Sequence, residues 1–126
     1  MSKDNLTLGF LAEDNAEKFL KSEGYKILER NYKTKLGEID IIAKDKDTLC
    51  FIEVKCRSSD RFGSGFDAVT GLKQRQIAKA ALSYLKENNL LDKKARFDVV
   101  ALDYSGSPAK IELIKDAFEL DGRFTY

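Results

Sequence analysis

The sequence contains no histidine, and this absence narrows the chemistry open to the protein. Histidine is the usual general base near neutral pH and the most frequent protein ligand of zinc and other soft metals. Any catalysis by this chain would therefore have to use carboxylates, lysines and a hard cation.

Cysteine is scarce as well: the chain has 2 cysteines, Cys50 and Cys56, in or directly after one expected strand. Extended backbone would hold them about 20 Å apart at ~3.3 Å per residue, which is beyond the reach of a disulfide. We therefore expect reduced thiols in a cytoplasmic protein, and disfavour the alternative that they bind a metal.

Two further absences concern membranes and charge. No apolar run approaches the ~20 residues of a membrane-spanning helix, and the polar residues 1–5 lack the apolar stretch of a signal peptide, so we expect neither. The formal net charge is only +1, so nucleic-acid binding would have to come from local basic patches. With 126 residues, 43% of them hydrophobic and 34% charged, the chain fits one domain, residues 1–126, with a true core.

Hydrophobic periodicity predicts the elements and their order. Apolar residues at helical spacing predict helices over residues 6–23 and about 66–88. β-branched and alternating segments predict strands over residues 25–32, 38–44, 48–56, 95–103 and 110–118, the last of which would also fit a short helix. The resulting order of helix, three strands, helix and two strands indicates an α/β domain with a meander followed by a helical crossover.

The expected hairpin between residues 38 and 56 gathers charged side chains. A turn of two or four residues would put Asp40 opposite Glu53, and Glu38 opposite Lys55, all on one face of the sheet. A turn of three residues would instead put Asp40 and Glu53 on opposite faces. The site therefore depends on this register.

Two close carboxylates repel each other unless a cation lies between them or one keeps its proton. Mg²⁺ suits Asp40 and Glu53 because it takes oxygen ligands and retains several waters. Lys55 could orient or deprotonate a water, or stabilise charge on a phosphate, which together would allow metal-assisted hydrolysis of a phosphodiester. The alternative is a charged strand face with cross-strand salt bridges. The charges interrupt apolar runs that look buried on both faces, which favours function.

The segments Gly37–Ala43 (GEIDIIA) and Phe51–Arg57 (FIEVKCR) resemble the PD-(D/E)xK nuclease superfamily. The closest resemblance is to the YraN-like family of uncharacterised bacterial proteins, which is similar to archaeal Holliday junction resolvases. It extends over almost the whole chain, through Ala12-Glu13, Gly24-Tyr25, Arg30-Asn31, Lys73 and Arg96-Phe97-Asp98. The proline in the superfamily's name is replaced by Ile39, a departure that is common in divergent members.

The resemblance implies a restriction-endonuclease-like core, with a mixed sheet of four to five strands flanked by helices. It also implies that Asp40 and Glu53 hold Mg²⁺ or Mn²⁺, that Lys55 is the catalytic lysine, and that Glu13 is the first-helix carboxylate. On helical spacing Glu13 borders the apolar stripe, so it either reaches the edge of the site or is a solvated carboxylate. Membership of a fold family does not by itself guarantee activity.

Basic residues cluster after the motif strand and offer contacts for a phosphate backbone. Lys73 lies on an apolar helical stripe and either extends to solvent or points to a phosphate near the site. Arg30, Lys33 and Lys35 form either a solvated edge or a second contact edge. The predicted nucleic-acid contacts are Arg57, Arg61, Lys73, Arg75 and Lys79.

Arg96 and Asp98 flank Phe97 and share a strand face, where a structural ion pair is the favoured interpretation. The leading functional hypothesis is a Mg²⁺- or Mn²⁺-dependent DNA endonuclease, with branched or junction DNA as its substrate and a homodimer as its assembly. The alternatives are a nucleic-acid-binding module that keeps the fold without cutting, and a protein-interaction domain of that fold.

Overall fold

A computed structural model describes residues 2–57 and 69–119, with side chains from residue 10 onward. The order of elements is the predicted one, and the bounds of the helices and strands are α1 (Ser2–Ser22), β1 (Lys26–Lys33), β2 (Glu38–Asp45), β3 (Thr48–Arg57), α2 (Gly71–Glu87), β4 (Ala95–Asp103) and β5 (Lys110–Phe118).

Two details differ from the sequence prediction. The second helix does not begin near residue 66: Thr70 is the N-cap of α2, and its side-chain oxygen accepts a hydrogen bond from the backbone N–H of Lys73. Such a cap satisfies one of the free N–H groups at a helix start, which apolar periodicity does not reveal. Residues 110–118 form a strand, so the helical alternative for this segment is wrong.

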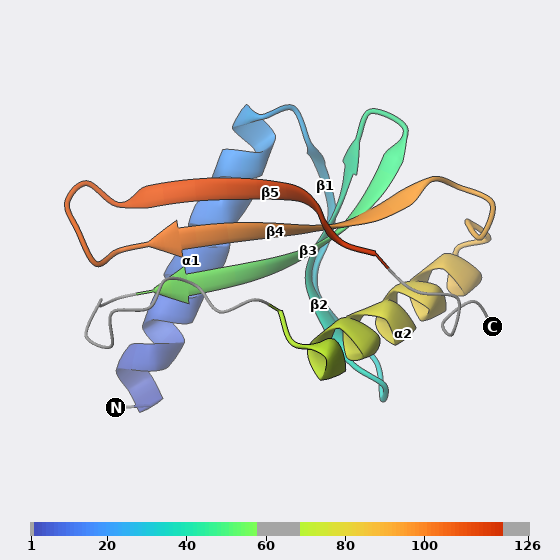
Figure 1. Cartoon of the computed structure of the whole chain (residues 1–126), viewed down its shortest axis with the longest axis horizontal. Coiled ribbons are helices and arrows are strands. Elements are labelled where there is room, and N and C mark those ends of the chain that lie inside the picture. Colours follow the sequence, from blue (N-terminus) through green and yellow to red (C-terminus); the bar gives the residue numbers. More distant parts are fainter. Residues whose placement is uncertain (1, 58–68, 120–126) are drawn as a thin grey trace.

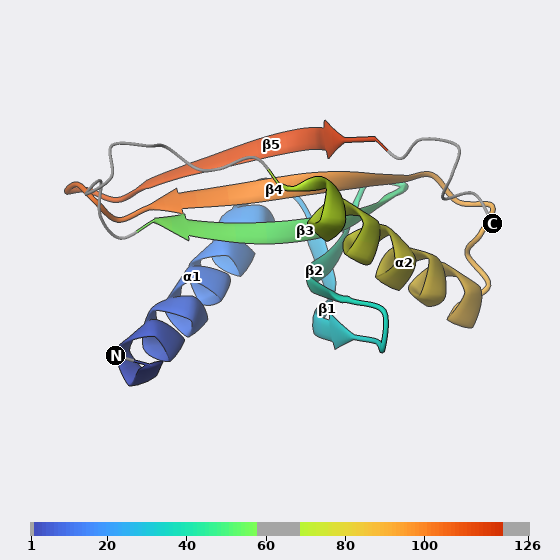
Figure 2. The same cartoon turned by 60° about the horizontal axis from the view of Figure 1, so that its bottom comes forward.

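The strands form one mixed sheet in the order β1-β2-β3-β4-β5. β3 and β4 are parallel and the other neighbours are antiparallel, because α2 carries the chain back between β3 and β4. The two helices cover opposite faces of this sheet (Figures 1 and 2). This confirms the predicted mixed α/β fold, and it is consistent with a restriction-endonuclease-like core.

Each face of the sheet has its own hydrophobic core. On one face, the buried α1 residues Ala12, Ala16 and Leu20 pack on the sheet. Beneath α2, Ile77 and Tyr84 pack on a second group of strand residues that includes Phe51. A strand that is buried on both faces has a continuous apolar sequence, as the first half of β3 does in Leu49–Ile52.

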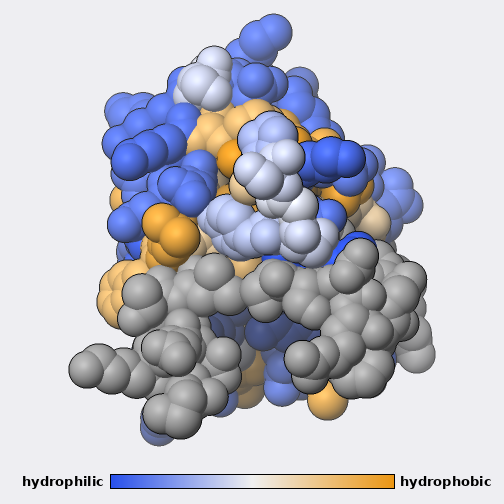
Figure 3. All heavy atoms as spheres, turned by 90° about the vertical axis from the view of Figure 1, so that its left-hand side faces the viewer, coloured by the Kyte–Doolittle hydropathy of each residue, from blue (hydrophilic) through white to orange (hydrophobic). Residues whose placement is uncertain are grey.

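Charged and polar side chains dominate much of the surface, in keeping with the high charged fraction. At the end of the molecule where β4 turns into β5, hydrophilic residues surround a smaller hydrophobic area (Figure 3). Within the described ranges, no helix is long and apolar enough to cross a membrane. Cys50 is buried and Cys56 is exposed, and both are free thiols, as predicted.

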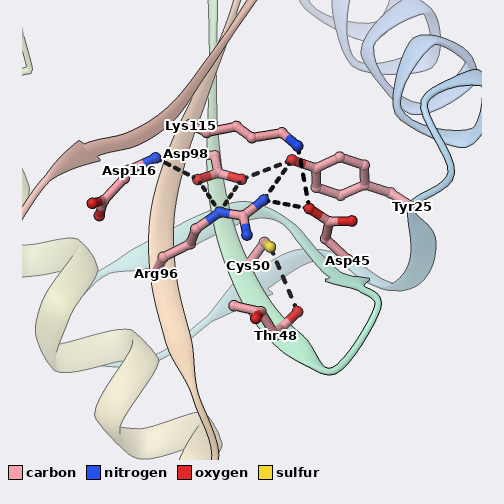
Figure 4. A network of polar contacts seen from close by, with 8 residues as sticks. All are labelled: Tyr25, Asp45, Thr48, Cys50, Arg96, Asp98, Lys115 and Asp116. Atoms are coloured by element: carbon pink, nitrogen blue, oxygen red, sulfur yellow. Dashed lines mark hydrogen bonds and ion pairs between the residues drawn. The ribbon is translucent and has the colours of Figure 1, made fainter.

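A polar network joins β2, β4 and β5 to Tyr25, in the connection from α1 to β1 (Figure 4). Asp98 is fully buried and accepts hydrogen bonds from Arg96 Nε at 3.0 Å and Tyr25 Oη at 3.0 Å. The same arginine donates to Asp45 Oδ2 at 2.7 Å. The predicted Arg96–Asp98 ion pair is therefore confirmed, and it belongs to a larger structural network.

Candidate active site

The turn between β2 and β3 has the register on which the predicted site depends. Asp45 pairs with Thr48 and Ile41 pairs with Ile52, so only Lys46 and Asp47 lie between the strands. Lys46 adopts a positive φ of 58°, as tight two-residue turns require. By the same register Asp40 lies opposite Glu53, and the three-residue alternative is wrong.

The sheet forks where these two carboxyl groups lie. Main-chain pairing of β2 with β3 ends at Ile41 and Ile52, whereas β2 stays paired with β1 to its first residue and β3 stays paired with β4 to its last. The two strands diverge beyond that point (Figures 1 and 2). Asp40 bridges the fork, because the backbone N–H of Val54 donates to its Oδ2 at 2.8 Å.

Asp40 and Glu53 bring their carboxyl groups close enough for each to shift the pKa of the other. Burial and the neighbouring Asp40 carboxylate raise the pKa of Glu53 from 4.5 to about 8. Burial also raises the pKa of Asp40, partly opposed by the hydrogen bond from Val54. Both shifts have the same direction, because burying two adjacent negative charges without a cation is costly.

Two lysines supply the positive charge near this pair. Lys73, at the start of α2, places Nζ 3.8 Å from Oε2 of Glu53, whose side chain is only 12% exposed. Both Lys73 and Lys55 act electrostatically to lower the pKa of Glu53. Lys73 therefore turns toward the carboxyl pair, and its contact with a phosphate stays a prediction.

Glu13 lies on the other side of the fork, on α1. Its charge raises the pKa of Asp40, so it is close enough to act on the pair. However, its Oε1 is 3.2 Å from Nη2 of Arg30, and this guanidinium also binds Asp14 and Glu17. Arg30 thus anchors β1 to α1, a role that its place in a basic run does not indicate.

The donor atoms at the fork fit a hard divalent cation. Among the residues that the structure describes, no three acidic, cysteine or histidine side chains form a metal-binding group. Asp40 and Glu53 nevertheless supply two converging carboxyl groups, and Mg²⁺ is often held by one or two carboxylates with waters completing its octahedron. Asp40, Glu53 and Glu13 remain the predicted metal ligands.

Gly37, directly before β2, sets the distance between the strand and α2. A Cβ atom added there would lie 2.5 Å from the backbone oxygen of Gln76 on α2. Gly37→Ala is therefore expected to lower the free energy of unfolding by roughly 1–3 kcal/mol, because backbone rather than a flexible side chain must move. Urea unfolding of this variant beside Gly106→Ala, where an added Cβ would meet no atom within 4 Å, checks the prediction. Equal stability of the two variants would contradict it.

The predicted nucleic-acid contacts occupy several positions. Arg75 and Lys79 are exposed on α2, the helix that also carries Lys73. Arg57 ends β3, and its Nε lies 4.0 Å from Oδ1 of Asp103. Arg61 lies outside the described residues. These contacts therefore start near the fork and continue along α2.

One protein family matches the part of the chain that contains the residues of the fork. A family model described as "Uncharacterised protein family UPF0102" matches residues 12–102, a range that contains Glu13, Asp40, Glu53, Lys55 and Lys73. The chain belongs to UPF0102. The predicted resemblance to the YraN-like family is thereby confirmed, while membership of the nuclease superfamily stays a prediction.

Individual UPF0102 relatives match along nearly the full chain. A UPF0102 protein of Geobacter metallireducens is 49% identical over 120 residues, which cover 95% of this chain and 98% of the relative. One from Geotalea daltonii is 52% identical over 118 residues, covering 93% of each. The family thus shares the length of the described fold.

Proposed function

We propose that the protein is a metal-dependent DNA endonuclease that hydrolyses phosphodiester bonds. The observation that carries this proposal is the fork itself, where the largely buried carboxyl groups of Asp40 and Glu53 lie close together and Lys73 Nζ lies 3.8 Å from Glu53 Oε2. A purely structural salt bridge would need only one carboxylate for that lysine. A second, buried carboxyl group with a raised pKa costs stability, and such costs are typical of functional sites.

Each group has a distinct role in this proposal. Asp40 and Glu53 hold Mg²⁺ or Mn²⁺, with Glu13 assisting from α1. Such an ion would supply Lewis-acid activation of the phosphate and of the attacking water. Lys55 positions the water or stabilises the charge that develops on the phosphate, and Lys73 neutralises a phosphate oxygen beside Glu53.

The substrate follows from the surrounding charge. Arg57, Arg61, Arg75 and Lys79 contact the phosphate backbone, which gives affinity without reading sequence. This favours recognition of DNA shape, and we propose branched or junction DNA. Cutting two strands at a branch would require a second site, which a symmetric homodimer supplies.

The test compares labelled single-stranded, duplex and four-way-junction DNA, each with EDTA, Mg²⁺ or Mn²⁺. Cleavage should appear only with metal, should be fastest on the junction, and should be missing in Glu53→Gln. Glu112→Gln, which changes an exposed carboxylate on β5, is the matched control and should cut normally. DNA binding that needs no metal and leads to no cutting would instead identify a binding module. Absence of DNA binding at every salt concentration would favour a protein-interaction domain.

A further inference from the structure

The exposed face of α2 is basic along its whole length. The helix has four basic residues, and its single acidic residue, Glu87, accepts a hydrogen bond from the hydroxyl of Tyr32 at 2.8 Å. Arg75, Lys79 and Lys86 are all exposed, and their spacings of four and seven residues align them on one stripe. The stripe begins at the same end of α2 as Lys73, but on the outer side of the helix, whereas Lys73 faces Glu53 at the fork. It leads to the opposite end of the helix.

A cavity of about 400 Å³ lies at that opposite end. It is enclosed by the start of β1, the β2–β3 turn and the connection from α2 to β4. Leucines form its apolar lining, and its charged residues are four lysines and two aspartates, namely Lys26, Lys44, Lys93, Lys94, Asp47 and Asp92. The lysines outnumber the aspartates, so the cavity is electropositive.

Folding brings these lysines together at some cost. Lys26 and Lys44 are direct cross-strand partners of β1 and β2, and like charges in that position are destabilising. Lys94 lies 4.0 Å from Asp47, but both side chains are more than 75% exposed, so this pair is weak. Across residues 2–57 and 69–119, no other described residue forms an ion pair with Lys26, Lys44 or Lys93. Uncompensated positive charge of this kind suits an anion.

The dimensions suit a nucleic-acid backbone better than a small anion. From Lys73 to Lys86 the helix advances about 20 Å at 1.5 Å per residue. B-DNA advances ~3.4 Å per nucleotide along one strand, so the length of α2 from Lys73 to Lys86 matches roughly six base pairs. The cavity lies just beyond the end of α2 to which the stripe leads, and a free mononucleotide would leave the stripe itself without a ligand.

We infer that the cavity is a second phosphate-binding site, which holds a double-stranded arm of the DNA roughly six or more base pairs from the cut. The inference rests on the proposed function, since it takes the fork as the point of cutting. The lysines bind backbone phosphates, and the leucines contact the apolar face of the deoxyribose. The enzyme would thus require a duplex arm on one side of the cut. It would bind substrates that lack such an arm only weakly.

The test is DNA binding by the double variant Lys44→Glu/Lys93→Glu. Lys44→Glu puts opposite charges across from each other on β1 and β2, so the fold should be retained. The matched control is Lys18→Glu/Lys110→Glu, which makes the same change of net charge at exposed positions of α1 and β5. Affinity for a labelled 24-base-pair duplex is measured by fluorescence anisotropy, without divalent metal, over a series of salt concentrations.

The cavity variant should lose at least tenfold in affinity, and its slope of log affinity against log salt should fall by about two. The control variant should change affinity no more than about twofold. Equal losses in both variants, or no loss in either, would overturn the inference. Saturable binding of AMP that only the cavity variant loses, with unchanged DNA affinity, would also overturn it and assign the cavity to a small ligand.

This assay contains no metal and records no cutting, so the two proposals fail separately. A protein that binds as described but never cuts would defeat the proposed function alone. A protein that cuts DNA while its cavity variant binds normally would defeat this inference alone.

Discussion

Replacing Glu53 with glutamine is expected to reduce DNA cleavage by roughly a thousandfold and, at the same time, to stabilise the metal-free protein. The loss of activity follows because a bound metal supplies several kcal/mol to the transition state, and about 4 kcal/mol corresponds to a thousandfold. The gain in stability follows because the glutamine amide can donate a hydrogen bond to Asp40 at any pH. The Glu53 carboxyl group can donate one only while it is protonated. A residue that serves folding alone would not show these opposite effects.

The stability gain should depend on pH in a defined direction. In the unfolded chain Glu53 ionises near its ordinary pKa of 4.5, whereas in the folded protein burial and Asp40 raise that pKa to about 8. Below pH 4.5 both states hold the proton, and Glu53 contributes no pH dependence. Between these two values folding requires a proton that the unfolded chain releases, so wild-type stability falls as the pH rises.

At pH 8 we expect Glu53→Gln to exceed the wild type by roughly 3–4 kcal/mol in the free energy of unfolding, since each unit of raised pKa is worth ~1.4 kcal/mol. Urea unfolding in EDTA at several pH values measures this difference, with Glu112→Gln as the control for an exposed carboxylate. A difference that is constant from pH 5 to pH 8 would show that folding does not raise the pKa of Glu53 as described.

Replacing Asp98 with alanine is expected to destabilise the protein by about 3–5 kcal/mol, the largest stability effect that we predict. Asp98 is fully buried, and it accepts hydrogen bonds from Arg96, Tyr25 and the backbone N–H of Asp116. Its removal leaves these donors without their acceptor, inside the core beneath α1. Arg96 keeps Asp45 as a partner, but several buried donors lose their acceptor at once, and each unsatisfied buried donor costs about 1–3 kcal/mol.

A double variant distinguishes the net contribution of the intact network to the free energy of unfolding from the loss caused by leaving the network incomplete. Arg96→Met combined with Asp98→Leu removes both charges and fills their volume, so it should be more stable than Asp98→Ala. Thermal and urea unfolding of the two variants provide the comparison. If the double variant were the less stable of the two, the network would contribute net stability rather than only a penalty when broken.

The sequence predicts the fold well because its strands and helices have clear hydrophobic periods. The strand 110–118 is the instructive case, since its spacing suits a helix as well as a strand. Its long-range pairing with β4, from Asp103–Lys110 to Phe97–Phe118, decides the matter. The start of α2 depends instead on a single capping side chain, Thr70, and periodicity says little about caps.

For the site, the sequence predicts the register that places Asp40 opposite Glu53, because a side-chain period of two and a short turn determine it. It does not predict the fork, since divergence of β2 and β3 depends on how each pairs with its outer neighbour. Nor does it predict that Arg30 binds Glu13, because that contact joins side chains 17 residues apart, on α1 and on the edge strand β1. The closeness of Gly37 to α2 likewise arises only from tertiary packing.

The most direct test of the proposed metal site is a titration of the pure protein with Mn²⁺, followed by the loss of the free-ion electron paramagnetic resonance signal. Wild type and Glu112→Gln should bind the ion equally, and Asp40→Asn and Glu53→Gln should each bind it at least tenfold more weakly. Wild-type protein that binds no Mn²⁺ at millimolar concentration, or fork variants that bind it as well as wild type, would contradict a metal site at the fork.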